Sequence, residues 1–226
     1  MGDRPAALHA RSLADPEGFW GEAAEAITWR TRPERVLDRS AAPLPRWFTG
    51  GVLNTCENAL DRHVAAGHGD RMALIHDSPV TGTVRRFTYA ELRDEVARTA
   101  GMLAALGVSR GDRVVIYLPM VPEAAIAMLA CARIGAIHSV VFGGFAAHEL
   151  AVRIDDARPS LVLSASCGIE GARVIPYKPL LDRAVELAEH RPRHLVILAR
   201  PQVAAALMPG RDLDWADQVA AAAPAD

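Results

Sequence analysis

Apolar residues recur along this chain as short unbroken runs that alternate with segments of helical spacing, most clearly between residues 113 and 165. The runs 113–118, 137–142 and 161–165 have the length of buried strands, and the segments between them carry apolar residues at helical intervals. A strand–helix–strand–helix–strand order predicts a parallel sheet with helices packed against it, which is an α/β fold. Strands of such a sheet are expected to be apolar throughout, because helices cover both faces.

The region before this sheet has its own start and stop signals. Thr88 and Glu91 have the spacing of a capping box, and Phe87 and Leu92 occupy the positions of a hydrophobic staple. A helix is therefore predicted to begin at this point. Gly107 suits the C-terminal cap of that helix.

Two shorter patterns lie further upstream. The runs 72–76 and 84–87 predict two strands joined by a hairpin-length turn. Asn54 and Glu57 resemble a second capping box, which predicts a helix that ends near Gly67.

The ends of the chain have weaker patterns. Residues 1–50 are rich in Arg, Pro and Trp, and they predict an extended arm with one helix that starts at Pro16. The first ten residues fit a disordered tail equally well. At the other end, a helix over 180–189 and a strand over 195–199 are predicted. The alanine-rich residues 216–226 show neither a strand nor a cap, and we interpret them as the end of an interrupted chain.

Composition narrows the range of functions. Half of the residues are apolar, and the net charge of −2 gives no electrostatic reason to expect nucleic acid or an anionic membrane as a partner. Cys56, Cys131 and Cys167 are far apart and form no C-x-x-C pair, so neither a disulfide framework nor a zinc site is indicated. No signal sequence is recognisable, and the longest apolar run, 124–132, is too short to span a bilayer. We therefore expect a soluble protein of the reducing cytoplasm.

A pair of glycines is the best candidate for a binding site. Gly143 and Gly144 follow the predicted strand 137–142, at the edge of a parallel sheet where ligands bind. Glycines allow a backbone to approach a ligand closely. A tight strand-to-helix turn without any ligand explains the same two residues, and the pattern leaves both interpretations open.

Other patterns carry less weight. Ser109 stands in a G-x-S-x-G sequence, but a nucleophile elbow needs a strand before the serine, and here the predicted order is helix, turn, strand. His148 and Glu149 lack the second histidine of a zinc-binding helix. His138 lies inside an apolar strand and is predicted to be a core residue.

Two pairs of charged residues have ordinary explanations as well as functional ones. Asp155 and Asp156 are neighbours on a predicted helix, where adjacent side chains point about 100° apart, so they do not form one acid–base site, and Asp156 is expected to face water. Arg173 and Lys178 flank a turn, where two cations either hold an anionic ligand or are simply solvated.

Long runs of the sequence resemble the N-terminal part of short-chain acyl-CoA synthetases, the acetyl- and propionyl-CoA synthetases of the AMP-forming, adenylate-forming superfamily. The resemblance covers nearly the whole chain and is carried by runs such as LNTCENALDRHV, GDRVVIYLPMVPEAAIAMLACARIGAIHSVVFGGFAAHELAVRIDDARPSLVLSAS and VIPYKPLLD. The segment that starts at Trp29 (WRTRPERV) and the turn that starts at Asp77 (DSPVTGT) are closer to the propionyl-CoA synthetase branch.

The resemblance implies an N-terminal region over residues 1–66 and, over 67–226, the first α/β portion of the ligase domain, a βαβαβ subdomain and thus an incomplete domain. It implies that propionate or acetate is joined to CoA, with ATP and CoA as substrates and Mg²⁺ assisting. In the family, the phosphate loop and a catalytic lysine lie downstream, and this sequence contains no match to them. We therefore expect the chain to be inactive alone, as a truncated product or one piece of a split enzyme, with a complementing chain or self-association.

The resemblance also implies binding residues at the CoA-facing edge. The turn that matches the family's Phe-Gly-Gly sequence near the CoA nucleotide is formed by Phe142, Gly143 and Gly144. The segment that matches the loop contacting the CoA phosphates includes Glu170, Gly171, Ala172 and Arg173. Arg173 matches a family arginine that can pair with a phosphate. Glu170 stands where acetyl-CoA synthetases have another arginine, and its carboxylate would repel a phosphate.

Overall fold

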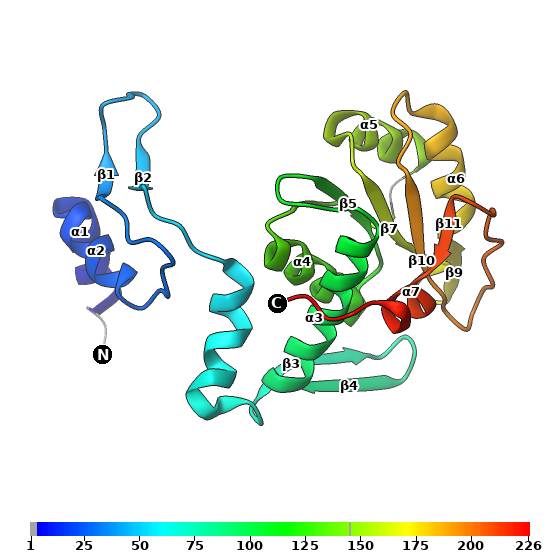
Figure 1. Ribbon diagram of the computed structural model, residues 1–226, viewed down its shortest axis with the longest axis horizontal. Coiled ribbons are helices and arrows are strands. Elements are labelled where there is room, and N and C mark those ends of the chain that lie inside the picture. The colour runs from blue at the N-terminus through cyan, green and yellow to red at the C-terminus, as the bar shows by residue number, and fades with distance from the viewer. Residues whose placement is uncertain (1–3, 145) are drawn as a thin grey trace. The chain divides into compact units, whose positions relative to one another are not determined.

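The computed structural model describes residues 4–144 and 146–226, and the chain divides into two compact units, Met1–Arg62 and His63–Asp226 (Figure 1). The first unit consists of two helices, a two-stranded hairpin and a helical segment with wide π-type turns. These elements are α1 (Arg4–Ala14), α2 (Pro16–Ala24), β1 (Arg35–Asp38), β2 (Arg46–Thr49) and η1 (Glu57–Asp61).

The start of the first unit corrects one expectation and confirms another. The chain was expected to begin as an extended arm or a tail, but α1 is a helix, none of whose residues is buried. Its alanine, leucine and arginine residues are among the best helix formers, so the helix does not depend on burial. The helix predicted at Pro16 is confirmed, because the Asp15 side chain accepts a hydrogen bond from the Gly18 amide at 3.0 Å.

The second unit is an α/β structure. In chain order its elements are η2 (Val64–His68), β3 (Met72–Ser78), β4 (Thr83–Thr88), α3 (Tyr89–Ala105), β5 (Arg113–Tyr117), α4 (Pro122–Ile134), β6 (Ile137–Val140), α5 (Ala147–Ala157), β7 (Leu161–Ala165), β8 (Cys167–Glu170), β9 (Arg173–Pro176), α6 (Tyr177–Leu187), β10 (His194–Leu198), β11 (Asp212–Asp214) and α7 (Trp215–Ala221). Strands β3 and β4 form the predicted antiparallel hairpin.

Five parallel strands form the central sheet in the order β11-β10-β7-β5-β6, which confirms the predicted fold class. Helices α5 and α6 pack together on one face, where Val115, Val162 and Leu195 line up across three neighbouring strands. Helices α3, α4 and α7 cover the opposite face (Figure 1). The sheet core is therefore buried from both sides, as its apolar strands require.

The predicted capping box at the start of α3 is confirmed. The Thr88 hydroxyl accepts a hydrogen bond from the Glu91 amide at 3.2 Å, and the Glu91 carboxylate accepts one from the Thr88 amide at 2.8 Å. At the earlier box, the Asn54 side chain accepts from the Glu57 amide at 3.1 Å, while the Glu57 carboxylate forms an ion pair with Arg30 at 3.0 Å.

Strand β6 departs from the expectation of strands buried on both faces. His138, predicted to be a core residue, is exposed, and Ile137 and Val140 are each 55% exposed. The reason is position, since β6 forms the edge of the sheet and pairs only with β5 among the described strands. The prediction for His138 is therefore wrong.

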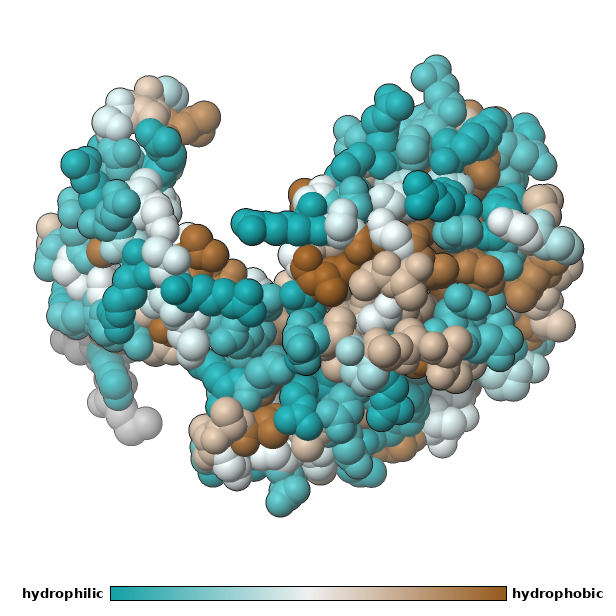
Figure 2. Space-filling view, in the orientation of Figure 1, coloured by the Kyte–Doolittle hydropathy of each residue, from teal (hydrophilic) through white to brown (hydrophobic). Residues whose placement is uncertain are grey.

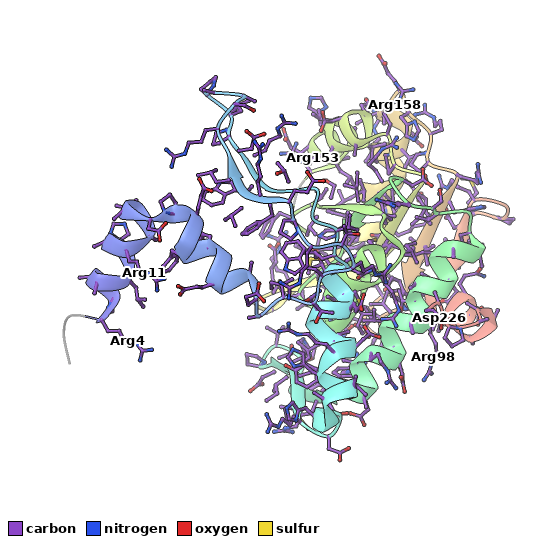
Figure 3. All side chains as sticks on the ribbon, turned by 60° about the vertical axis from the view of Figure 1, so that its left-hand side comes forward. Arg4, Arg11, Arg98, Arg153, Arg158 and Asp226 are labelled. Atoms are coloured by element: carbon purple, nitrogen blue, oxygen red, sulfur yellow. The ribbon has the colours of Figure 1, made fainter. Side chains whose placement is uncertain are left out.

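Residues 216–226 were predicted to show neither a strand nor a cap, but most of α7 lies among them, and its first turn is capped by Asp214 accepting from the Asp217 amide at 3.1 Å. Strand β11, just before this helix, pairs in parallel with β10. The last residues then run beside α3 (Figures 1 and 3), where the Ala225 amide donates to the Ala97 carbonyl at 2.9 Å. A Cβ atom on Gly101 would stand 1.8 Å from the Ala223 carbonyl oxygen, so glycine permits this contact.

Candidate functional site

A pocket of about 290 Å³ lies beside the Gly143–Gly144 turn, at the carboxyl ends of the parallel strands. Ligands bind at this end of open α/β sheets. The lining comes from the turns after β5 and β6, the β3–β4 hairpin, the β8–β9 hairpin and the residues at the start of α6 and after β10: Ser78, Val80, Thr81, Leu118, Pro119, Met120, Val140, Val141, Phe142, Gly143, Gly144, Ile169, Glu170, Tyr177 and Arg200.

Two glycines make room for one buried tyrosine in this lining. A Cβ atom on Gly143 would stand 2.4 Å from the Tyr177 hydroxyl oxygen, and a Cβ atom on Gly168 would stand at the same distance from it. Both values are shorter than any real carbon contact, so a side chain at either position requires a shift. The Tyr177 ring is thus held between the turn after β6 and strand β8.

Burial raises the pKa of the Tyr177 phenol, and the Glu170 carboxylate raises it further, while Arg200 acts in the opposite direction. Burial likewise raises the pKa of Tyr117, whose ring stacks on that of Tyr177. Both hydroxyls are therefore neutral at physiological pH, since an unperturbed tyrosine already titrates near pH 10. A neutral phenol both donates and accepts a hydrogen bond.

The Glu170 carboxylate lies against the glycine turn. Its Oε1 atom is 3.1 Å from the place that a Cβ atom of Gly144 would take. Glu170 pairs with Arg173 across the two-residue turn of the β8–β9 hairpin, and Gly171 in that turn has a φ of +57°. A glycine suits this turn because residues with a side chain rarely adopt positive φ.

The seven residues expected at the CoA-facing edge fall into two groups. The four that line the pocket are Phe142, Gly143, Gly144 and Glu170. The other three, Gly171, Ala172 and Arg173, form the exposed turn of the β8–β9 hairpin and are not part of the lining. The segment expected as a binding loop is therefore an antiparallel hairpin that presents one end to the pocket.

Tyr177 and Arg200 are among the lining residues that sequence reasoning missed. Arg200 lies two residues beyond the end of strand β10, and its Nη1 atom donates to the Cys167 carbonyl at 3.1 Å. A charged residue shortly after a buried strand, at the ligand-binding edge of the sheet, was the available signal. Tyr177 was assigned to a loop because α6 was predicted to begin three residues later than it does.

Lys178 was expected either to hold an anionic ligand or to be solvated, and the structure shows neither. Its side chain is 5% exposed and its Nζ atom lies 2.7 Å from Asp182 and 2.8 Å from Asp212. Arg211 completes the cluster, with its Nε atom 2.6 Å from Asp212. Burial opposes ionisation of Asp212, but hydrogen bonds from Arg211 and Lys178 outweigh it and hold the pKa of this carboxyl below its usual range. The cluster joins α6 to β11 and offers no anion site.

The remaining candidates have structural roles. The amide and hydroxyl of Ser109 both donate to Asp112 at 2.8 Å in the turn between α3 and β5, so the rejected nucleophile elbow is indeed a helix-to-strand turn. Asp155 accepts from the His190 amide at 2.8 Å, and Asp156 is exposed as predicted. Within residues 4–144 and 146–226, no group of three or more His, Cys, Asp or Glu side chains is arranged to hold a metal ion.

Comparison with known proteins places this chain in a family. The family described as AMP-binding enzyme matches residues 61–225, and the family described as acetyl-coenzyme A synthetase N-terminus matches residues 6–59. The chain therefore belongs to the AMP-binding enzyme family and carries the N-terminal region of acetyl-CoA synthetases. The resemblance to short-chain acyl-CoA synthetases is confirmed.

Individual relatives agree with this assignment. The propionate–CoA ligase of Salmonella typhimurium is 51% identical over 209 residues, which are 92% of this chain and 33% of the ligase. The human mitochondrial acyl-CoA synthetase short-chain family member 3 is 50% identical over 214 residues, 94% of this chain and 31% of that protein. The structure of acetoacetyl-CoA synthetase from Streptomyces lividans matches with a TM-score of 0.84 at 30% identity, covering 96% of this chain and 33% of the synthetase.

The chain thus spans about a third of the length of the relatives that it matches. In the described part of the chain, no helix has both the length and the apolar character needed to cross a membrane.

Proposed function

We propose that this chain is the N-terminal portion of an AMP-forming acid–CoA ligase for a short-chain carboxylate, and that the pocket beside Gly143 receives the CoA nucleotide. The observation that carries the proposal is the pocket itself, which lies at the glycine turn of a chain whose relatives include a propionate–CoA ligase. Propionate and acetate are the two candidate acids, and the relative named propionate–CoA ligase favours propionate.

In the proposed reaction, a carboxylate oxygen attacks the α-phosphate of ATP, so that pyrophosphate leaves and an acyl-adenylate forms. The CoA thiolate then attacks the acyl carbon and AMP leaves. Mg²⁺ would offset phosphate charge in the first step. The described residues contain no metal-binding cluster, so none of them is assigned to Mg²⁺.

The pocket residues support the CoA assignment. Gly144 is exposed at the turn, and because it has no side chain its backbone can approach a ligand closely. Phe142 offers an aromatic ring at the rim, 70% exposed, against which a nucleotide base can stack. Arg173 on the adjacent hairpin turn is exposed and can pair with a phosphate from outside the lining.

The test of the proposed function has two parts. Purified chain incubated with ATP, CoA and propionate is expected to yield neither propionyl-CoA nor AMP above background, because it contains no match to the family's phosphate loop. The same chain is expected to bind CoA. Turnover by the chain alone would contradict the first part, and the absence of CoA binding at millimolar concentration would contradict the second.

A second candidate is a non-catalytic module that acts with a complementing chain or with its own copies. The observation in its favour is apolar exposure near the β6 edge, where Ile137, Val140 and Phe142 are exposed and Met120 is 92% exposed. Figure 2 shows a further band of hydrophobic residues across the middle of the second unit. Monomers rarely expose large apolar patches. Size-exclusion chromatography with light scattering is expected to show self-association, and a clean monomer without dye binding would count against this candidate.

The cytoplasmic location also remains a proposal. Cys56, Cys131 and Cys167 are buried as thiols, which suits a reducing compartment, although one relative carries a mitochondrial name. Cell fractionation with an antibody to the chain would decide between a cytoplasmic and an organellar pool.

A further inference from the structure

The pocket contains a cation that the family resemblance does not assign. We propose that Arg200 binds a phosphate group of the CoA nucleotide, an inference that rests on the proposed function of the pocket. Arginine suits this role because its planar fork of N–H donors matches the oxygens of a phosphate.

Contacts at both ends of the residue hold Arg200 in place. Its backbone amide donates to the Ser166 hydroxyl at 2.9 Å, and its Nη1 atom donates to the Cys167 carbonyl at 3.1 Å. Ser166 and Cys167 are both buried. The guanidinium is thus oriented before any ligand arrives, which reduces the entropy lost on binding.

Most of the donors of this guanidinium remain available. A guanidinium has five N–H donors. In the described part of the chain the only hydrogen bond from the Arg200 side chain is the one to Cys167, and no carboxylate lies within ion-pair distance. The positive charge in the pocket is therefore not neutralised by an internal partner.

The two charges in the pocket favour one position of an anion over another. Among the described lining residues only Glu170 and Arg200 are charged, and no ion pair joins them. Glu170 and Arg200 both act on Tyr177, because they shift the pKa of its phenol in opposite directions. An anion is repelled from the Glu170 side, where the carboxylate lies against Gly144, and is attracted to the Arg200 side. Glu170 therefore selects where the phosphate lies within the pocket.

This arrangement differs from the one expected from the resemblance, in which Arg173 pairs with the phosphate. Arg173 lies on an exposed hairpin turn outside the lining, so solvent screens its charge. Arg200 is partly buried inside the pocket, and its contact with a phosphate is worth more.

The experiment is a calorimetric titration of the 226-residue chain with CoA at low and high salt. Arg200→Gln removes the charge and is expected to weaken binding roughly ten- to hundred-fold and to flatten the salt dependence. Arg200→Lys is expected to recover part of the affinity and the salt dependence. Arg98→Gln, on α3 and so on the other face of the sheet from α6, is the matched control and is expected to bind like the wild type (Figure 3).

Dephospho-CoA distinguishes the two sources of phosphate. If Arg200 holds the 3′-phosphate, the loss caused by Arg200→Gln disappears with dephospho-CoA, and if it holds the diphosphate, the loss persists. Either result supports the proposal. Glu170→Gln is a second variant, which is expected to tighten CoA binding several-fold because it removes the repelling charge.

Two results would overturn the inference, and they are distinguishable. If the wild type binds CoA and Arg200→Gln binds equally well with the same salt dependence, Arg200 has no role and the proposed function stands. If the wild type gives no heat with millimolar CoA, the proposed CoA site is wrong and the inference fails with it. Thermal unfolding of each variant shows whether a loss of CoA binding reflects misfolding. If the Arg200 variants misfold, the Glu170→Gln variant decides the question. An unchanged CoA affinity of Glu170→Gln would count against the proposed arrangement of charges.

Discussion

The ring of Tyr177, the first residue of α6, stacks on the ring of Tyr117, the last residue of β5, with centroids 4.8 Å apart and planes inclined by 28°. Both residues belong to the buried core beneath α5 and α6. Offset stacking of this kind adds to the energy of burial. The stack fixes Tyr177 to the sheet, and Tyr177 in turn supports the two glycine-containing segments beside the pocket.

The first prediction concerns these glycines. Gly143→Ala and Gly168→Ala are each expected to destabilise the chain by about 1–3 kcal/mol, because both new methyl groups overlap Tyr177. Tyr177→Phe is expected to rescue Gly143→Ala, since the ring carbons nearest to that methyl group would be 3.1 Å away once the hydroxyl is gone. It is not expected to rescue Gly168→Ala, because ring carbons remain at 2.5 Å. Urea unfolding of the wild type, the three single variants and the two double variants measures the free energies to be compared.

The informative quantity is the difference in the stability that Tyr177→Phe restores to Gly143→Ala and to Gly168→Ala. Equal rescue of both glycine variants, or no destabilisation by either, would show that the Tyr177 ring is not held between these segments.

The second prediction concerns the buried ion cluster. Lys178→Met is expected to lower the free energy of unfolding by about 3–5 kcal/mol, because it leaves the fully buried Asp212 carboxylate without one of its two cations. Arg183→Ala is the control on the same helix, where an exposed pair with Glu186 is removed, and it is expected to change stability by less than about 1 kcal/mol. Denaturant unfolding compares the two variants. A similar small loss for both would contradict the assigned role of Lys178.

The third prediction is a pH dependence with a definite sign. The pKa of Asp212 is lowered in the folded chain, so its contribution to stability is complete above the unfolded pKa of about 3.9 and is lost as the pH falls through the folded pKa. Unfolding free energies between pH 7 and pH 3 are expected to fall with acid. Asp212→Asn is expected to be less stable at pH 7 and to show a shallower loss below pH 5. An unchanged acid slope in this variant would contradict the assignment.

The sheet could be predicted because its strands and helices are specified locally. The strand 161–165 is mostly apolar, and the capping box at Thr88 fixes the start of α3 in both the sequence and the structure. Edge strands are harder, since the run 137–142 is apolar at both ends and only the order of strands shows that His138 is exposed. The short strand β11 is defined by pairing with β10, and this contact is not visible in three residues of sequence.

The candidate site was predictable only in part for a similar reason. Gly143 and Gly144 could be placed because the position after a parallel strand is a known binding edge. Arg200 reaches the pocket from the segment after β10, more than fifty residues further along the chain, and the close approach of Gly168 to Tyr177 depends on packing. Lys178 was expected to hold an anion or to be solvated, and its burial was not predicted because its partner Asp212 comes from β11, more than thirty residues further along the chain.

The central claim is that the pocket beside Gly143 receives CoA. The most direct measurement is a two-dimensional amide NMR titration of the isotope-labelled chain with CoA. We expect concentration-dependent shifts at Gly143, Gly144, Ile169 and Glu170, which line the pocket, with little change on α3. Shifts that gather elsewhere, or a spectrum unchanged at millimolar CoA, would contradict it.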